Sequence, residues 1–160
     1  GAEIKDILEY SASCFYNRAG KGTGPLLKDG VRNGYYISAC GIDYTIDVTR
    51  EEGDRVRILS MSDGKPFDMN RNYRTTVNSF MACGAESPLF KVPGLTRDGI
   101  RRRTIVVSGA DIRYYIITDF YIKGENGKSV TMPDYGNWCL IPENSVKEMA
   151  SSGTVNNILR

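Results

Sequence analysis

Near its start, the chain repeats apolar residues at steps of three and four, which is the spacing of one face of a helix. This stripe predicts a helix from Ala2 to Asn17. Its members are Ile4, Ile7, Leu8, Ser11 and Phe15. A second helix is predicted after Ser108, a favourable N-cap, and Gly124 is expected to end it. Its expected inward positions are Ile112, Tyr115, Ile116 and Phe120.

Between these helices the period changes to two, which predicts a cluster of neighbouring strands. Asp63-Gly64 is expected to form a type I′ turn with positive φ at both residues. Asn78 to Gly84 is predicted to contain a short turn of helix. The predicted strands are Gly34–Cys40, Ile42–Val48, Arg55–Met61, Tyr73–Asn78, Thr104–Val107 and Trp138–Ile141. Helices that flank such strands indicate an α+β fold with a mixed, mainly antiparallel sheet.

Arg18 to Asn33 is rich in glycine and is predicted to be a loop. Its Gly-Lys-Gly-Thr-Gly run lacks the Lys-Ser/Thr pair that closes a Walker motif, and no strand is predicted before it. We therefore do not interpret this loop as a phosphate cradle.

The 160 residues include no histidine, which narrows the possible chemistry. Ser-His-Asp and Cys-His nucleophile systems are excluded, as is zinc bound by histidine. The acidic residues are scattered, and no two have the spacing of a paired general acid and base. A formal net charge of +2 argues against a binder of nucleic acid polymers, and Arg101–Arg103 is interpreted as a solvated basic patch.

The four cysteines, Cys14, Cys40, Cys83 and Cys139, stand far apart and show no metal-ligand spacing. Three disulfide pairings are possible, but a chain of this size can bury a sufficient core without them, so we expect free thiols. No apolar stretch approaches the ~20 residues that a membrane helix needs, and we expect no membrane span.

Aromatic residues provide the most specific functional hint. Tyr35, Tyr36 and Phe80 lie beside glycines and element ends, where rings can face a cleft. Two facing rings would form a slot for a flat ligand such as a nucleobase, whereas the alternative is that these rings fill the core. Glu86 lies in irregular chain near Phe80, where a carboxylate could accept hydrogen bonds from a sugar or a base edge.

Several segments, in order and spacing, resemble the C-terminal domain of the 5′-nucleotidase family, which includes UDP-sugar hydrolases and 2′,3′-cyclic-nucleotide phosphodiesterases. Gly1–Glu9 is similar to a helix of the form G-x-x-L-x-x-x-L-E, and Gly34–Asp47 to the strand pair G-x-F-L-Q-V-S-G-L-x-x-x-x-D. The remaining similar segments are Gly53–Arg57 (G-x-R-V), Asp63–Asp68 (N-G-x-P-L-D), Tyr73–Phe80 (Y-x-V-x-x-N-x-F), Asp111–Ile116 and Asn137–Pro142. The last two resemble a subgroup of exported bacterial members, which implies a periplasmic or cell-surface location.

The resemblance implies a division of labour between two domains. Residues 1–160 would form a single nucleotide-binding domain, as a fragment of a longer phosphoric ester hydrolase. A divalent metal pair, with its His and Asp ligands, would belong to an N-terminal metallophosphoesterase domain of the same protein. This chain would then hold no cofactor and have no activity by itself.

By position, the resemblance assigns Tyr36 and Phe80 to the two rings that hold the base. Ser38 falls where the family offers an amide to the base edge, and its hydroxyl could donate or accept there. Glu86 falls where the family's aspartate binds the ribose hydroxyls, although the Gly84-Ala-Glu-Ser wording differs from the family's G-G-D-G. An alternative function is a non-catalytic interaction or scaffold module that has lost nucleotide binding and uses the Arg101–Arg103 patch.

Overall fold

A computed structural model describes residues 1–15, 26–28, 36–129 and 136–151. Its contacts divide the chain into two compact units, each described by itself. Unit 1 comprises Gly1–Thr75 and Gly136–Arg160, and unit 2 comprises Thr76–Tyr135. Tyr35 and most of the predicted glycine-rich loop lie outside the described residues. The interpretation of the whole chain as one domain stays a prediction.

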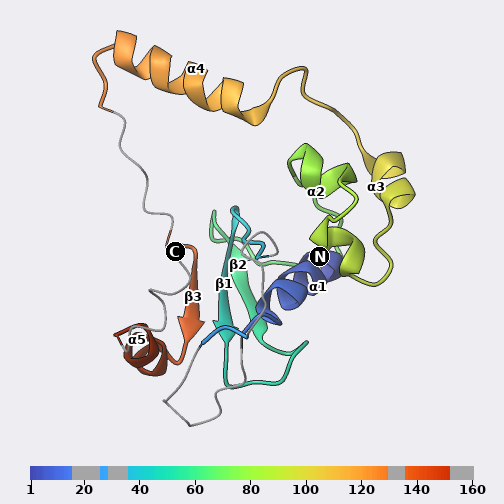
Figure 1. Ribbon diagram of the computed structural model, residues 1–160, viewed down its shortest axis with the longest axis vertical. Coiled ribbons are helices and arrows are strands. Elements are labelled where there is room, and N and C mark those ends of the chain that lie inside the picture. The colour runs from blue at the N-terminus through green and yellow to red at the C-terminus, as the bar shows by residue number, and fades with distance from the viewer. Residues whose placement is uncertain (16–25, 29–35, 130–135, 152–160) are drawn as a thin grey trace. The chain divides into compact units, whose positions relative to one another are not determined.

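Unit 1 is built on a three-stranded mixed sheet in the order β2-β1-β3. In Figure 1, β1 (Ile42–Asp47) lies between β2 (Val56–Met61) and β3 (Trp138–Ile141). β1 pairs with β2 antiparallel and with β3 parallel. Helix α1 (Ala2–Ala12) packs against β2, and α5 (Glu143–Ser151) packs against β3. This arrangement confirms the predicted α+β fold with a mixed sheet.

The core of unit 1 lies between α1 and the alternating inward side chains of β1. Along Ile42–Asp47, every second residue is buried, as expected for a strand with one face on a core. The buried apolar residues of this core are Leu8, Ala12, Phe15, Ile42, Tyr44, Ile46, Val48 and Val56. α1 ends at Ala12, earlier than predicted, and the Arg55 side chain donates to the Ala12 carbonyl, as described below.

The turn between β2 and the following segment differs from the predicted type. Gly64 has a φ of 81°, but within the described residues no residue other than glycine has positive φ, so Asp63 does not. Asp63 instead accepts a hydrogen bond from the Lys65 amide through Oδ1 (3.1 Å). The reversal is therefore in the predicted place, but it is not a type I′ turn.

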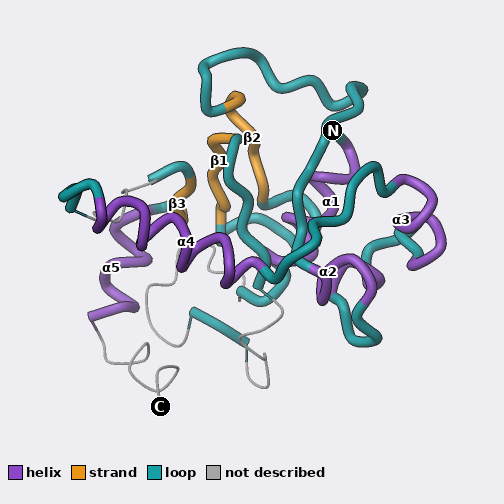
Figure 2. Tube along the Cα trace, turned by 90° about the horizontal axis from the view of Figure 1, so that it is seen from above, coloured by secondary structure: helices purple, strands orange, loops and turns teal. Residues whose placement is uncertain are grey.

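Three predicted strands are absent from the described residues: 36–40, 73–78 and 104–107 carry no strand. The tube in Figure 2 shows strands only at β1, β2 and β3 within the described part of the chain. Thr- and Val-rich composition gives a strand only where a partner backbone is present. In the 73–78 segment, Tyr73 instead stacks on Phe67 with ring centroids 4.9 Å apart.

Unit 2 contains α2 (Ser79–Cys83), the 3₁₀ helix η2 (Pro88–Lys91), α3 (Arg97–Arg103) and α4 (Ile112–Glu125). The short helix at α2 confirms the prediction, whereas the sequence analysis predicted no helix at α3. Leu89 in η2, and Val92 and Leu95 between η2 and α3, are buried. α4 begins at the N-cap Asp111 instead of Ser108, because the Asp111 carboxylate accepts the Arg113 amide (2.9 Å).

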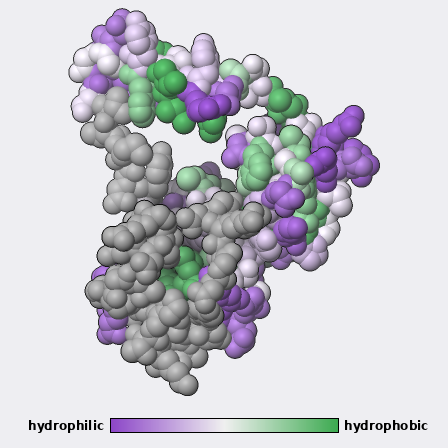
Figure 3. Space-filling view, viewed as in Figure 1, coloured by the Kyte–Doolittle hydropathy of each residue, from purple (hydrophilic) through white to green (hydrophobic). Residues whose placement is uncertain are grey.

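α4 exposes the residues that the sequence pattern placed inward. Ile112, Tyr115, Ile116 and Phe120 are between 45 % and 60 % exposed. The helix carries apolar side chains around much of its circumference, and Figure 3 shows them in green along α4. Because apolar residues are not confined to one stripe, their spacing does not select a single buried face.

Candidate functional site

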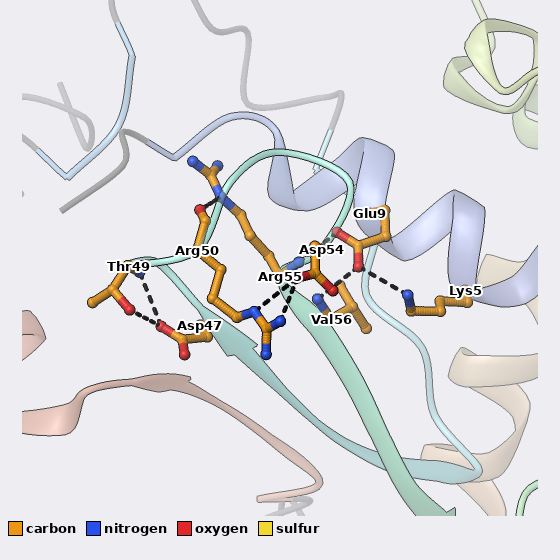
Figure 4. Close-up of polar contacts among 8 residues, drawn as sticks. All are labelled: Lys5, Glu9, Asp47, Thr49, Arg50, Asp54, Arg55 and Val56. Carbon is orange, nitrogen blue, oxygen red and sulfur yellow. Dashed lines mark hydrogen bonds and ion pairs between the residues drawn. The ribbon is translucent and has the colours of Figure 1, made fainter. Parts of the chain in front are cut away.

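A buried carboxylate joins α1 to β2. Glu9, the last residue of the G-x-x-L-x-x-x-L-E segment, accepts the backbone amides of Arg55 (3.0 Å) and Val56 (2.8 Å) through its two oxygens. Lys5, one turn earlier on α1, lies 3.5 Å from the same carboxylate. Figure 4 shows these contacts where β2 begins. The glutamate thus satisfies two amides at the outer edge of the sheet.

Arg55, from the G-x-R-V segment, is only 2 % exposed, yet its guanidinium is well satisfied. Nη1 donates to the carbonyl oxygens of Ala12 and Phe15, both at 2.8 Å, and Nε donates to the carbonyl of Arg50 at 2.9 Å. A cation at the end of α1 also opposes the negative end of the helix dipole. Glu9 and Arg55, which the sequence analysis placed in motif segments, thus have a structural role. Their burial was not predicted.

The segment that carries the predicted site residues Tyr36 and Ser38 is held by side chains instead of a neighbouring strand. Ser11 Oγ on α1 accepts the Ile37 amide (2.6 Å) and donates to the Ile37 carbonyl (2.9 Å). One buried hydroxyl therefore makes both bonds that a residue of a pairing strand would make. This is the physical reason why the predicted strand is absent at 36–40.

Asn137, just before β3, fixes the other end of this segment. Its Nδ2 donates to the carbonyls of Ala39 (2.7 Å) and Ile42 (2.8 Å). The Ala39 amide in turn donates to the Tyr44 hydroxyl (3.3 Å). The sequence analysis placed Ser11 in the apolar stripe and Asn137 in a segment similar to the family, but it gave neither residue a role. A polar residue within an apolar stripe was the available signal for Ser11.

Tyr36 packs among other rings. Its centroid is 6.0 Å from that of Phe15, edge to face, and 5.6 Å from that of Trp138. Its side chain is partly buried, and its hydroxyl oxygen is buried without a hydrogen-bond partner in the described part of the chain. Burial raises the pKa of the Tyr36 phenol, with smaller contributions from Tyr44 and Cys14. Ser38, two residues along, is exposed.

Phe80 and Glu86 lie in unit 2, and both are exposed. Asn78 caps α2 by accepting the Met81 amide through Oδ1 (2.8 Å), which orders the turn that carries Phe80. The Phe80 ring lies against Gly84, because a Cβ at that position would meet Phe80 Cδ2 at 2.8 Å and its carbonyl oxygen at 2.5 Å. Glycine at position 84 therefore lets the ring lie over the end of α2.

The four predicted site residues thus fall into two pairs. Tyr36 and Ser38 share one segment of unit 1, and Phe80 and Glu86 share the α2–η2 segment of unit 2. The proposed slot between the two rings stays a prediction.

Among the described residues, no group of three or more His, Cys, Asp or Glu side chains is placed to hold a metal ion. No helix in the described ranges has the length and apolar character required to cross a membrane.

Comparison with known proteins shows the family to which this chain belongs. A family model described as the 5′-nucleotidase, C-terminal domain, matches residues 1–93, which is more than half of the chain. The chain therefore belongs to this family. The matched range contains α1, the β1–β2 hairpin and all four predicted site residues. No curated protein matches the chain, and no solved structure matches it.

We predict that Arg55→Met destabilises the fold by about 2 to 4 kcal/mol. Methionine retains an apolar stem but leaves the carbonyls of Ala12 and Phe15 without their donor, and an unsatisfied buried group costs about 1 to 3 kcal/mol. Urea unfolding measures the change. The matched control is Arg50→Met in the same turn, because the Arg50 side chain is exposed and its ion pair with Asp54 contributes at most about 1 kcal/mol. Equal losses in the two variants would contradict the role given to Arg55.

Burial raises the pKa of the Cys14 thiol from 9.0 to about 11. The other three cysteines are free and exposed. Because the thiolate is the reactive form, iodoacetamide at pH 8.5 should modify Cys14 more slowly than the other three, as mass spectrometry of timed samples would measure. The difference should vanish in urea. Since the folded pKa exceeds the unfolded one, this thiol's contribution to stability is present below pH 9 and is lost as the pH rises to about 11.

Proposed function

We propose that this chain is the nucleotide-binding part of a 5′-nucleotidase-type phosphohydrolase. The observation that carries the proposal is the family match, because residues 1–93 include Tyr36, Ser38, Phe80 and Glu86. A phosphate ester would be cleaved on a separate N-terminal domain with a divalent metal pair, which would supply the activated water. The substrate would be a nucleoside monophosphate, a cyclic nucleotide or a nucleotide sugar, and the protein would act in the periplasm or at the cell surface.

In this proposal each residue has a distinct task. Tyr36 and Phe80 stack on the two faces of the base, and stacking contributes roughly 1 to 3 kcal/mol per base. Glu86, exposed beside η2, accepts hydrogen bonds from the ribose hydroxyls. The exposure of Phe80, at 50 %, leaves a ring surface open to a ligand. Stacking on Tyr36 would use the part of its ring that Phe15 and Trp138 leave uncovered.

We predict that Phe80→Ala and Tyr36→Ala each weaken nucleoside binding by roughly 1 to 3 kcal/mol through loss of stacking. Trp138 is the only tryptophan in the chain and lies next to Tyr36, so its fluorescence reports adenosine binding there. Tyr36→Phe keeps the ring and should bind like the native chain. Tyr121→Ala, an exposed aromatic on α4, serves as the control for Phe80→Ala. Undiminished affinity in a folded Phe80→Ala variant would rule out the slot.

A further prediction follows from the division of labour. The purified chain should bind nucleosides yet release no phosphate from AMP in the presence of Mn²⁺ or Zn²⁺, because catalysis is assigned to the other domain. A phosphate-release assay before and after an additional purification step checks this. Hydrolysis at a specific rate that survives the purification would show that the assignment is wrong.

One observation favours a second candidate, an interaction module without nucleotide binding. α3 ends in three arginines, and Ile105, Val106 and Val107 after it are 71 to 82 % exposed. Exposed apolar surface next to a basic patch is typical of a contact region. The adenosine titration separates the two candidates, since this one requires that no nucleoside bind.

A further inference from the structure

Three adjacent arginines end helix α3. Arg101, Arg102 and Arg103 form its last turn, and all three are exposed. This is the only place in the 160 residues where two basic residues are adjacent. An arginine guanidinium binds a carboxylate through two parallel hydrogen bonds, so adjacent arginines give a specific signal to a partner that has an acidic pocket for each of them.

The chain that follows the arginines has an accessible backbone. Residues 101–109 are all exposed, and 104–109 form neither helix nor strand. Within the described part of the chain, the peptide groups of Ile105, Val106 and Val107 make no hydrogen bond. An enzyme that binds a peptide as an added strand needs such open main-chain groups, because it pairs with them.

The structure of α3 allows its last turn to open. None of its seven residues is buried. Two contacts at its end are local: Arg103 Nε donates to the Gly99 carbonyl (3.3 Å), and the Thr104 hydroxyl donates to the Ile100 carbonyl (2.9 Å). A short helix without buried side chains opens locally at low cost in free energy. Unwinding the last turn therefore takes no buried side chain of α3 into water.

We propose that the Arg103–Thr104 peptide bond is a processing site for an endoprotease that recognises adjacent arginines. Hydrolysis consumes one water molecule and leaves a carboxylate on Arg103 and an amino group on Thr104. The N-terminal fragment contains all of residues 1–93, which match the family, and the C-terminal fragment contains α4, β3 and α5. This site goes beyond the proposed function and does not depend on it.

The two fragments should stay together after cleavage, because the sheet of unit 1 takes strands from both. β3, in the C-terminal fragment, pairs with Tyr44–Asp47 of β1 in the N-terminal fragment. Asn137 adds two hydrogen bonds between the fragments, and Trp138 stacks on Tyr44 with ring centroids 6.1 Å apart. Cleavage would thus give a nicked protein whose halves are joined without a covalent bond.

Kexin, an endoprotease that cleaves after paired basic residues, is the probe for the folded full chain. Mass spectrometry should find fragments 1–103 and 104–160, and cleavage at any other bond would contradict the assignment. The rate should lie within about tenfold of that for a synthetic peptide of residues 97–109, since proteolysis follows the population of the opened form. A folded chain that stays intact while the peptide is cleaved would overturn the proposal.

Size-exclusion chromatography tests the nicked state. The cleaved chain should elute with the uncleaved one and should separate into two fragments in urea. Fragments that separate without urea would show that β3 does not hold them together.

Arg102→Gln distinguishes recognition of the pair from simple exposure. This change leaves Arg103 in place but removes every adjacent pair, so kexin cleavage should fall by about a hundredfold through loss of one charged contact. Trypsin, which requires a single basic residue, should still cleave after Arg103. Arg74→Gln is the matched control, because Arg74 is also exposed outside helices and strands but has no basic neighbour. Kexin cleavage that Arg102→Gln leaves unchanged, or that Arg74→Gln lowers, would contradict recognition at adjacent arginines.

The chain recovered from its own cells tests whether processing occurs there. Chymotrypsin does not cleave after arginine, so its digest keeps a natural end at Arg103 distinct from one made during preparation. Mass spectrometry should find one peptide that ends at Arg103 and another that begins at Thr104. If only peptides that run across this bond are found, the processing role is wrong.

Discussion

The packing of α1 on the sheet depends on a buried carboxylate and a buried guanidinium that form hydrogen bonds mainly with backbone groups. Glu9 receives two amides from the start of β2, and Arg55 donates to carbonyls at the end of α1 and in the preceding turn. Each of the two segments thus places a charged side chain against peptide groups of the other that have no backbone partner there, and it satisfies them. Groups of this kind are costly when unpaired, so the two elements are stabilised in one relative arrangement.

The packing of α1 on β2 also positions the segment that leads to β1. With α1 fixed against β2, Ser11 faces the chain that leads to β1 and takes both peptide groups of Ile37. From the β3 side, the Asn137 amide donates to the carbonyls of Ala39 and Ile42. The segment with Tyr36 and Ser38 is therefore held by residues far away in the sequence, and its ring packs on Phe15 and Trp138 from those same elements.

The segments that resemble the family contain two kinds of residue, which the structure separates by their burial. Glu9 and Arg55 belong to the motif segments, but their observed partners are backbone groups inside unit 1. Tyr36, Ser38, Phe80 and Glu86 belong to similar segments, and three of these four are exposed. A motif residue that is buried and fully bonded has a structural role, whereas an exposed one is available for a ligand. Burial therefore separates two roles that the sequence motifs do not distinguish.

By itself, the sequence determined the elements whose pattern is local: the first helix, the β1–β2 hairpin, the reversal at Gly64 after β2, the helical turn capped by Asn78, and the strand before Pro142. Alternation, capping residues and glycine act over a few positions and are visible in the residues themselves. The family also followed from the order of short segments. Only the tertiary structure decided which Thr- and Val-rich segments become strands, because a strand requires a partner backbone, and at Ile37 a serine hydroxyl takes that place. It also decided that Arg55 is buried, since two of its carbonyl partners, Ala12 at the end of α1 and Phe15 just after it, lie about forty residues earlier in the chain.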